Sequence, residues 1–548
     1  MVDKSLQQIR VRELALPVEE ALDPDVPLRQ LTAQKLGIAA ASLPPLKVVR
    51  RALDARHRAL RYVYTVELRL DTKTAERLAR TGDIETARKV ERYKYQLKKK
   101  PDAAQPLVVG SGPAGLFAAL SLAEAGWPPV VIERGRPVAE RGRDVSTLYA
   151  RGILHPDSNV CYGEGGAGTY SDGKLYTRVN DPRVDRVMEA LVGFGSDPDI
   201  LVDHRPHLGT DRLVQLLVTI RAHLEALGTV FRFSTTAERF EVKDGSLKTV
   251  ILRDGERIPV DTTVLATGHS AREIWERLLD AGLPLEKRPF AVGFRVEHPQ
   301  SLINRLRYGA TANRGILPAA DYRLTYNESG DEGRGVYSFC MCPGGVVVPT
   351  PTQSEELCIN GMSHASRSGR FANSALVVTV SPADYAAAGF EGPLAGVQFQ
   401  HAAEHKAYEL GGGAFVAPAC RITDFMNKRP SSQLGTTSYR RGIWPADLEA
   451  LYPAAVNDAL RRGIASFEKK MHGFLTEDAV LLGVETRTSS PVRVPRGEDM
   501  QATGATGLYP AGEGVGYGGG IISSAVDGMR AAESILQSVG AERVVVEG

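Results

Sequence analysis

The chain has 548 residues, of which 43% are apolar, 24% charged and 7% aromatic, a composition typical of an ordinary globular protein with about two to four domains. Its net charge of +2 gives no overall reason to expect a nucleic acid or an anionic membrane as partner, and five scattered cysteines exclude a secreted disulfide framework. No run of residues approaches the ~18 apolar residues of a membrane helix, so we expect a reduced, cytoplasmic protein without a membrane partner.

The first hundred residues differ in charge from the rest of the chain. Residues 1–100 hold 22 Lys and Arg against 13 Asp and Glu, whereas the remaining residues hold 45 against 52. A basic run followed by Pro101 marks the boundary, so we expect a small basic α+β module before it. The apolar periodicity predicts strands over 9–12 and 60–66 and helices over 28–36 and 84–97.

A basic stretch within this module has two interpretations. Arginines interleaved with tyrosines are typical of an RNA surface, where cations bind phosphates and aromatic rings stack on bases. The same arginines also suit docking of the module onto the acidic remainder of the chain, and the opposite net charges of the two parts favour docking. The residues concerned are Arg50, Arg51, Arg56, Arg58, Arg61, Tyr62 and Tyr64.

From residue 106 the pattern changes to short apolar strands, glycine turns and amphipathic helices. A strand over 107–109 leads into a glycine turn, a helix over 116–125 and a second strand over 130–132 that ends at Glu133. This order predicts a dinucleotide site: the glycines let the backbone approach a pyrophosphate at the helix N-terminus, and Glu133 accepts hydrogen bonds from the adenosine ribose. The turn consists of Gly110, Ser111, Gly112, Pro113, Ala114 and Gly115.

Segments of this α/β kind occur at 106–180 and again at 504–537, which indicates one Rossmann-like domain split by a large insertion. The stretch between them contains predicted strands over 229–233, 346–348 and 376–380 and a helix over 212–227. The expected organisation is a module at 1–100, a Rossmann-like α/β domain at 105–275 and 501–548, and an inserted mixed α+β substrate domain at 276–500.

Three later segments resemble those of glutathione-reductase-type flavoproteins. Residues 261–268 resemble the strand and turn of that family, and residues 507–513 resemble its closing motif, in which an acid hydrogen-bonds the ribityl chain of the flavin. The apolar helix after 520 resembles the one whose N-terminus faces the isoalloxazine ring. The resemblance implies that the interrupted domain binds FAD rather than NAD, with cofactor contacts from Thr267, Gly268, Gly512, Glu513, Gly519, Gly520 and Ile521.

Longer motifs resemble the family of uncharacterised FAD-dependent dehydrogenases. The resemblance covers almost the whole chain, including the N-terminal module, and implies an FAD-dependent oxidoreductase while specifying no substrate. The motifs lie at 163–175, 268–273, 287–299, 485–492 and 514–523.

Several residues outside the glycine turn are further candidates for cofactor contacts. A glycine run after Glu133 exposes N–H groups to an anion and is expected to hold the phosphates or the ring of the flavin. Arg141 and Arg143 either add positive charge near the pyrophosphate or are solvated surface residues. The cofactor candidates in this part are Arg134, Arg141, Gly165, Gly166 and Gly168, and possible substrate contacts are Asp172, Lys174 and Tyr517.

His269 follows the turn at 268 directly and is the catalytic candidate, because an imidazole titrates near neutral pH and can shuttle a proton during hydride chemistry. The alternative, which we favour, is that His269 only orients the cofactor or caps the helix that follows.

Cys340 and Cys342 stand two residues apart, on one face if the segment is a strand. A redox pair or a soft-metal site is one interpretation, but no Cys/His cluster completes a metal site, so we expect two buried small residues and no metal. No second dinucleotide motif occurs between 180 and 500. NAD(P)H as electron donor would therefore bind without a Rossmann domain of its own.

These patterns predict an FAD-dependent oxidoreductase, of dehydrogenase or reductase type, that transfers hydride between a small-molecule substrate and flavin N5. Two alternatives stay open. One is an RNA-modifying flavoenzyme in which residues 1–100 grip the RNA, and the other is a non-catalytic flavin-binding sensor.

Overall fold

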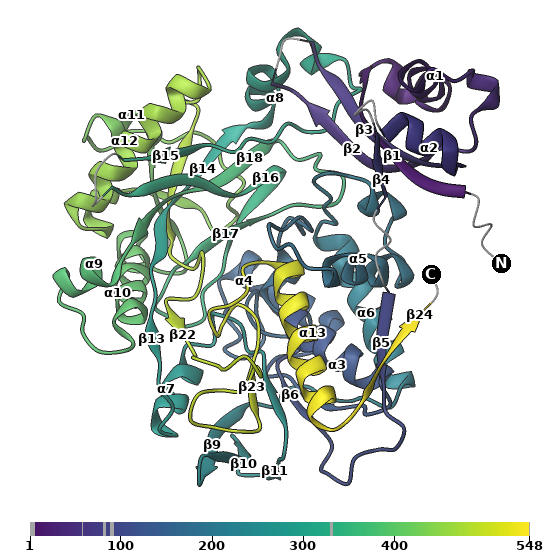
Figure 1. The fold of residues 1–548 in the computed structure, drawn as a ribbon. Helices are drawn as coiled ribbons and strands as arrows, with labels where there is room; N and C mark the ends of the chain where they lie inside the picture. Colours follow the sequence, from purple (N-terminus) through teal and green to yellow (C-terminus); the bar gives the residue numbers. More distant parts are fainter. Residues whose placement is uncertain (1–5, 57–58, 80–83, 88–91, 329–332, 547–548) are drawn as a thin grey trace.

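A computed structural model describes residues 6–56, 59–79, 84–87, 92–328 and 333–546. The chain forms a small N-terminal sheet, a parallel sheet flanked by helices, and a large mixed sheet. Figure 1 shows the N-terminal sheet beside the mixed sheet, with the parallel sheet and its helices below both. Within the described ranges, every helix is too short or too polar to cross a membrane.

The N-terminal module is a four-stranded antiparallel sheet in the order β2-β3-β1-β4. Val11 in β1 and Val66 in β3 are paired in register and completely buried, because alternate residues of each strand face the module's core. The strands predicted over 9–12 and 60–66 and the helix over 28–36 are confirmed. The elements are β1 (Leu6–Pro17), α1 (Asp25–Leu36), β2 (Lys47–Asp54), β3 (Arg61–Asp71), α2 (Thr72–Ala79) and β4 (Ile84–Thr86).

The helix predicted over 84–97 is wrong. The described residues of this stretch form β4 and a separate strand, β5 (Arg92–Gln96). β5 pairs with β24 (Glu542–Val546) and buries Tyr93 and Tyr95, so the tertiary pairing overrides the helical pattern. The strand that leads out of the N-terminal module is thus fixed to the C-terminal strand (Figure 1).

The parallel sheet has the strand order β23-β12-β6-β7-β8, which is the order of a Rossmann-like sheet. Thr263 lies opposite both Leu107 and Leu508, so the C-terminal segment completes the sheet that the first segment begins. The helix α13 packs on α3, where a side chain at Gly528 would collide with the carbonyl of Ala114. The strands are β6 (Leu107–Val109), β7 (Val130–Ile132), β8 (Val230–Arg232), β12 (Thr263–Leu265) and β23 (Leu508–Pro510).

Helices and an antiparallel meander surround the parallel sheet. The helix predicted over 212–227 and the strand over 229–233 are confirmed as α6 and β8. The helices are α3 (Pro113–Glu124), α4 (Val138–Arg151), α5 (Arg183–Gly193), α6 (Thr210–Ala226), α7 (Glu273–Asp280) and α13 (Ile521–Ser538), and the meander is β9 (Ala237–Lys243), β10 (Ser246–Leu252) and β11 (Arg257–Pro259).

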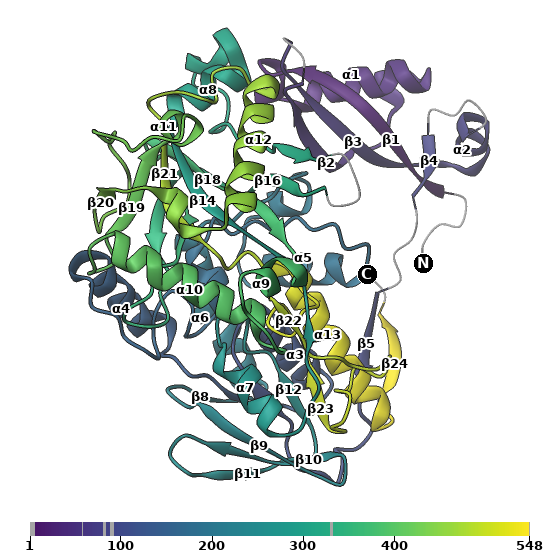
Figure 2. The same cartoon turned by 90° about the vertical axis from the view of Figure 1, so that its left-hand side faces the viewer.

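The inserted region is built on the mixed sheet, in the order β15-β16-β18-β14-β21-β19-β20 with β17 beside β16. α12 packs on β16 and β18, and α10 packs on β19 and β21 (Figure 2). The strands predicted over 346–348 and 376–380 are confirmed. The strands are β14 (Phe290–Pro299), β15 (Thr325–Asn327), β16 (Gly335–Pro349), β17 (Ile359–Met362), β18 (Phe371–Val380), β19 (Ala417–Arg421), β20 (Ile443–Pro445) and β21 (Val480–Glu485). The helices are α8 (Gln300–Tyr308), α9 (Pro382–Ala387), α10 (Ala395–Leu410), α11 (Ile422–Met426) and α12 (Ala454–Lys470), and β13 (Glu286–Lys287) pairs with β22 (Val492–Arg493).

The N-terminal module docks on the segment that follows α5. The backbone N–H of Arg51 donates to the carbonyl of Val202, and the N–H of His204 donates to the carbonyl of Arg51. The Arg51 guanidinium also lies 2.8 Å from the carboxylates of both Asp199 and Asp203. These hydrogen bonds and ion pairs dock the module onto the rest of the chain, which is the interpretation that the opposite net charges favour.

Candidate functional site

The cavity that the dinucleotide turn opens into has a volume of about 1400 Å³. The glycine turn after β6, the turn after β12, the turn after β23 and the N-terminus of α13 meet around it. Four segments that are far apart in the sequence therefore face one space. The predicted cofactor residues that line it are Gly110, Gly112, Pro113, Ala114, Glu133, Arg134, Gly166, Gly168, Thr267, Gly268, Gly512, Glu513, Gly519, Gly520 and Ile521.

The glycine turn has the close backbone packing that its sequence predicts. Gly110 has a φ of 104°, and a side chain there would place its Cβ 2.5 Å from the carbonyl oxygen of Ala266. A side chain at Gly115 would collide with the carbonyl of Gly110. Gly112 caps α3 and lies at the cavity, so the free N–H groups of this helix end face the cavity.

Glu133 lies at the cavity wall and is almost completely buried. Its carboxylate accepts hydrogen bonds from the backbone N–H groups of Ser111, Gly135 and Gly163, at 2.9–3.0 Å, and from the Ser111 hydroxyl at 2.8 Å. Four donors occupy the four lone-pair sites of a carboxylate. Glu133 thus fixes three loops to one another, and the rotatable Ser111 hydroxyl is the partner that a ribose hydroxyl can replace.

Arg141 is completely buried, so the solvated surface position considered for it is wrong. Its guanidinium donates to the backbone carbonyls of Asn159 and Val160, at 2.8 Å each, and to carbonyls in the glycine loop. Because these carbonyls use its donors, Arg141 holds the glycine loop in place from the side away from the cavity. Arg141 is not among the described residues that line the cavity. Arg143 is exposed.

Three other predicted residues also lie behind the cavity wall. Ser111 faces Glu133, Gly115 faces the Gly110 carbonyl, and Gly165 lies under Leu217. They pack behind the residues that line the cavity and are not part of the lining themselves. Arg134 does line the cavity, held 2.6 Å from both Asp157 and Glu273 and stacked over the Tyr162 ring at 4.1 Å.

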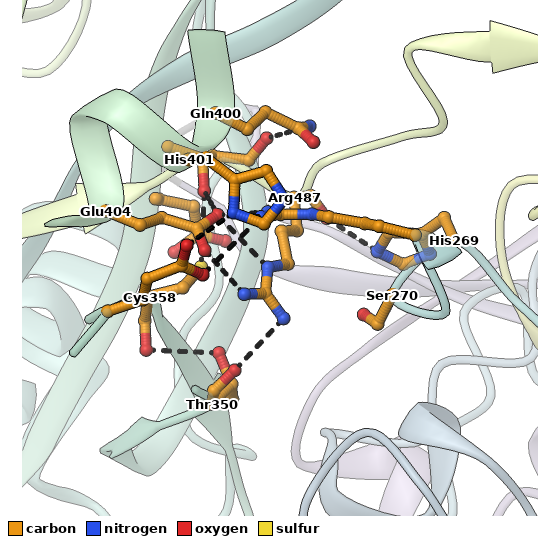
Figure 3. Close-up of polar contacts among 12 residues, drawn as sticks. His269, Ser270, Thr350, Cys358, Gln400, His401, Glu404 and Arg487 are labelled. Carbon is orange, nitrogen blue, oxygen red and sulfur yellow. Dashed lines mark hydrogen bonds and ion pairs between the residues drawn. The ribbon is translucent and has the colours of Figure 1, made fainter. Parts of the chain in front are cut away.

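His269 lies between the two turns at the C-terminal ends of β12 and β23. Its Nε2 is 3.0 Å from the backbone carbonyl of Arg487 (Figure 3). Its Nδ1 is 3.6 Å from the Glu513 carboxylate. A carbonyl only accepts hydrogen bonds, so Nε2 carries the hydrogen and Nδ1 is the nitrogen left to face Glu513 and the cavity.

Arg487 is a site residue that we did not single out from the sequence, although it lies within the motif at 485–492. It lines the cavity and donates to the buried Glu404 at 2.5 Å and to the Thr350 carbonyl at 3.3 Å (Figure 3). Arg272, just after the turn that carries His269, donates to the same carboxylate. Burial alone would raise the pKa of Glu404, but the two guanidinium groups hold that pKa well below its usual range.

Asp172 and Lys174 mark the far side of the cavity. The Asp172 carboxylate pairs with Lys174 at 3.1 Å and with Arg367 at 2.5 Å, and the Lys174 ammonium also donates to the backbone carbonyl of Met341. Burial by itself would raise the pKa of Asp172, but these two cations lower it to about 2. Both side chains line the cavity, and Tyr517 lines it as well.

The expectation of two buried cysteines on one face is wrong for Cys340. Cys342 is buried, whereas the side chain of Cys340 is exposed to the cavity. A register shift between Phe339 and Cys342, with a φ of 44° at Cys340, breaks the strand alternation that the spacing assumed. The buried Arg295 donates to the Cys340 carbonyl at 2.7 Å and pairs with Glu485 at 2.8 Å.

The turns and helix ends around the cavity fit FAD because of the hydrogen-bond donors that they present. They include two helix N-termini, those of α3 and α13, and glycine turns without side chains between them, which suit a pyrophosphate and a flat ring. The cavity volume also exceeds the ~300–1,000 Å³ that is usual for small-molecule sites. Among the residues that the structure describes, no group of three or more His, Cys, Asp or Glu is arranged to hold a metal ion.

Comparison with known sequences identifies two matched regions. Residues 289–488 match a family described as FAD-dependent protein, C-terminal domain-like, and residues 8–69 match a domain of unknown function, DUF8436. An uncharacterised protein of Clostridium beijerinckii is 41% identical over 536 residues, which are 96% of this chain and 98% of that protein.

Two solved flavoprotein structures resemble the fold at low sequence identity. The glycerol-3-phosphate dehydrogenase of Bacillus halodurans, complexed with FAD, is 10% identical, with a TM-score of 0.31 over 82% of this chain and 67% of its own. The quinol fumarate reductase FrdA of E. coli is 12% identical, with a TM-score of 0.37 over 80% of this chain and 71% of its own.

Proposed function

We propose, from the premise that this chain belongs to the family of FAD-dependent proteins whose C-terminal domain its residues 289–488 match, that it is an oxidoreductase acting on a small molecule. The substrate enters the cavity between the parallel sheet and the inserted region, where a bound flavin would exchange hydride with it at N5. The flavin ring supplies the two-electron chemistry when FAD is bound.

One observation carries this proposal: two segments about 240 residues apart in sequence complete one parallel sheet, and their turns open into one cavity. In this arrangement the N-terminus of α3 binds the pyrophosphate and Glu133 takes a ribose hydroxyl in place of the Ser111 hydroxyl. Glu513 contacts the ribityl chain, and the N-terminus of α13 lies at the ring. The cavity still has a second wall, formed by the inserted region together with residues 171–179 and 203–206, which is free for a substrate.

His269 orients the cofactor or moves a proton at Nδ1, because the Arg487 carbonyl fixes its other nitrogen as a donor. The Glu513 carboxylate lies 3.6 Å from Nδ1. The contact with His269 is made by the backbone carbonyl of Arg487 and does not bring Arg487 to the substrate. It is a positioning residue that holds the His269 ring through its backbone.

The decisive experiment is an anaerobic titration of the FAD-loaded protein with NADH and with NADPH, followed by the visible absorbance of the flavin. We expect at least one of the two to bleach the flavin, and a metabolite screen to identify a compound that reoxidises it. A colourless protein that does not take up added FAD would contradict the proposal. FAD-loaded protein that no donor reduces and no compound reoxidises would favour a flavin-binding sensor instead.

A single substitution tests the ribose assignment. We expect Glu133→Ala to weaken FAD binding by about tenfold or more, because a charged acceptor of ribose hydroxyls is lost. Glu140→Ala, an exposed acid on α4, is the matched control and should leave FAD affinity unchanged. The free energy of unfolding of the FAD-free variant separates lost loop contacts from lost cofactor contacts. Unchanged FAD affinity in Glu133→Ala would reject the assignment.

A further inference from the structure

The cavity has a wall that the cofactor turns do not form, and we call it the basic lobe. Its segments contact one another directly. The Lys174 ammonium donates to the Met341 carbonyl, and Arg205 pairs with Asp321 at 2.9 Å. The basic lobe is therefore one continuous wall, and it consists of the residues that line the cavity within 174–178, 203–206, 321–327 and 337–342.

The charges of the basic lobe do not balance. Arg178 and Arg323 both line the cavity, both are exposed, and neither has a hydrogen bond or an ion pair with any residue that the structure describes. Each carboxylate at this end, by contrast, has a cationic partner within 3.1 Å: Asp172 has Lys174, Asp203 has Arg51 and Asp321 has Arg205. Two guanidinium groups are thus available for an anion from outside the protein.

Flat aromatic surface lies next to these guanidinium groups. Tyr176, two residues before Arg178, is 46% exposed. Tyr337 and Phe339, from β16, line the same wall with their rings edge to face at a centroid distance of 6.4 Å. Tyr337 is paired in register with Thr325, two residues after Arg323. The two unpaired arginines and these three rings therefore line one wall of the same cavity, where a ligand can contact both.

We propose that the basic lobe binds a small organic oxyanion with a flat, unsaturated body, and that this ligand is the substrate of the oxidoreductase. The inference rests on the proposed function. Arg178 and Arg323 hold the oxyanion, since a guanidinium presents paired donors to a carboxylate or a phosphate. Tyr176, Tyr337 and Phe339 contact the body.

Calorimetric titration of the FAD-loaded protein with three probes of the same body tests the inference: 1-naphthoate, 1-naphthyl phosphate and the neutral 1-naphthamide. We expect one of the two anions to bind at least about tenfold more tightly than the amide, because a charge-assisted hydrogen bond is worth that factor or more. Tighter binding of the naphthoate identifies a carboxylate ligand, and tighter binding of the naphthyl phosphate identifies a phosphate.

The double variant Arg178→Gln/Arg323→Gln should lose the preference for the anion and keep its affinity for 1-naphthamide. Both side chains are exposed, so the fold is unaffected. Arg239→Gln, an exposed arginine on β9 outside the cavity lining, is the matched control and should behave like the original chain. Equal binding of anions and amide, or an anion preference that survives in the double variant, would overturn the inference.

The flavin absorbance of the same samples keeps the two proposals apart. Protein that takes up no FAD but still prefers the anion through Arg178 and Arg323 would contradict the proposed function and support the basic lobe. Protein that takes up FAD and is reduced, but shows no anion preference, would support the proposed function and contradict the inference about the basic lobe.

Discussion

The two walls of the cavity are built from different groups. The wall from the parallel sheet is mostly backbone: Gly110 and Gly268 have positive φ angles, and helix ends supply the N–H groups. The wall from the inserted region depends on buried charges, among them Arg295 with Glu485 and Arg487 with Glu404. Each turn of the backbone wall is formed by residues near one another in sequence, whereas Arg295 and Arg487 pair with carboxylates from distant elements. The inserted wall should therefore lose more stability when one residue is changed.

The largest expected effect is in the inserted wall. Glu404→Ala leaves Arg272 and Arg487 buried without their shared carboxylate, and we expect a loss of about 3–5 kcal/mol in the free energy of unfolding. Glu409→Ala, an exposed acid on the same helix, is the control and should change it by less than about 0.5 kcal/mol. Denaturant unfolding measures both, and equal effects would show that the Glu404 cluster is not a stabilising contact.

A smaller loss is expected in the backbone wall. Gly110→Ala forces a Cβ against the Ala266 carbonyl, and we expect it to cost about 1–3 kcal/mol and to reduce FAD uptake. Gly193→Ala at the end of α5, where a Cβ meets no atom within 4 Å, is the control and should be neutral or slightly stabilising. If Gly110→Ala takes up FAD normally, the close packing of the turn is not what shapes the cofactor site.

The Asp172 cluster adds a pH test between the two walls. The pKa of Asp172 is lowered to about 2, so its ionised form stabilises the folded chain by about 2 kcal/mol above pH ~4. This contribution declines as the pH falls and is lost below about pH 2, where the carboxyl is protonated in both states. The unfolding free energy of the original chain minus that of Asp172→Asn should decrease over this range. A difference that is constant with pH would contradict the assignment.

The smallest effect belongs to the docking of the N-terminal module. Arg51 is partly exposed where it pairs with Asp199 and Asp203, so Arg51→Gln should cost no more than about 1 kcal/mol, and less at high salt. Arg12→Gln, whose exposed pair with Glu85 lies within the module, is the control for salt effects alone. A loss of several kcal/mol in the free energy of unfolding would show that docking of the module stabilises the protein as much as the contacts of either wall.

The sequence predicts the backbone wall well because each of its features is local. A strand, a glycine turn, a helix and an acid within 30 residues are enough to place Gly110, Gly112 and Glu133 at a cavity. It does not reveal that Arg141 faces inward, since the residues that accept its hydrogen bonds form an irregular loop at 159–166.

The inserted wall is harder to predict because its pairs are distant and its strands are irregular. Glu404 and Arg487 are 83 residues apart in the sequence, and no local pattern around either residue predicts that the two side chains pair. The exposure of Cys340 depends on a register shift in β16 that no spacing rule anticipates. The pattern at 92–96 predicts part of a helix although these residues form a strand, because the pairing with β24, more than 400 residues away, leaves no local signal.

The late position of β23 and α13 has a consequence for how this protein is made. A chain emerging from the ribosome folds its earlier parts first. The N-terminal module and the mixed sheet can form while β12 still has an open edge, because the strand that covers this edge starts only at Leu508. We therefore expect FAD to be loaded only after β23 has been synthesised, and a product that ends before this strand to have an exposed sheet edge.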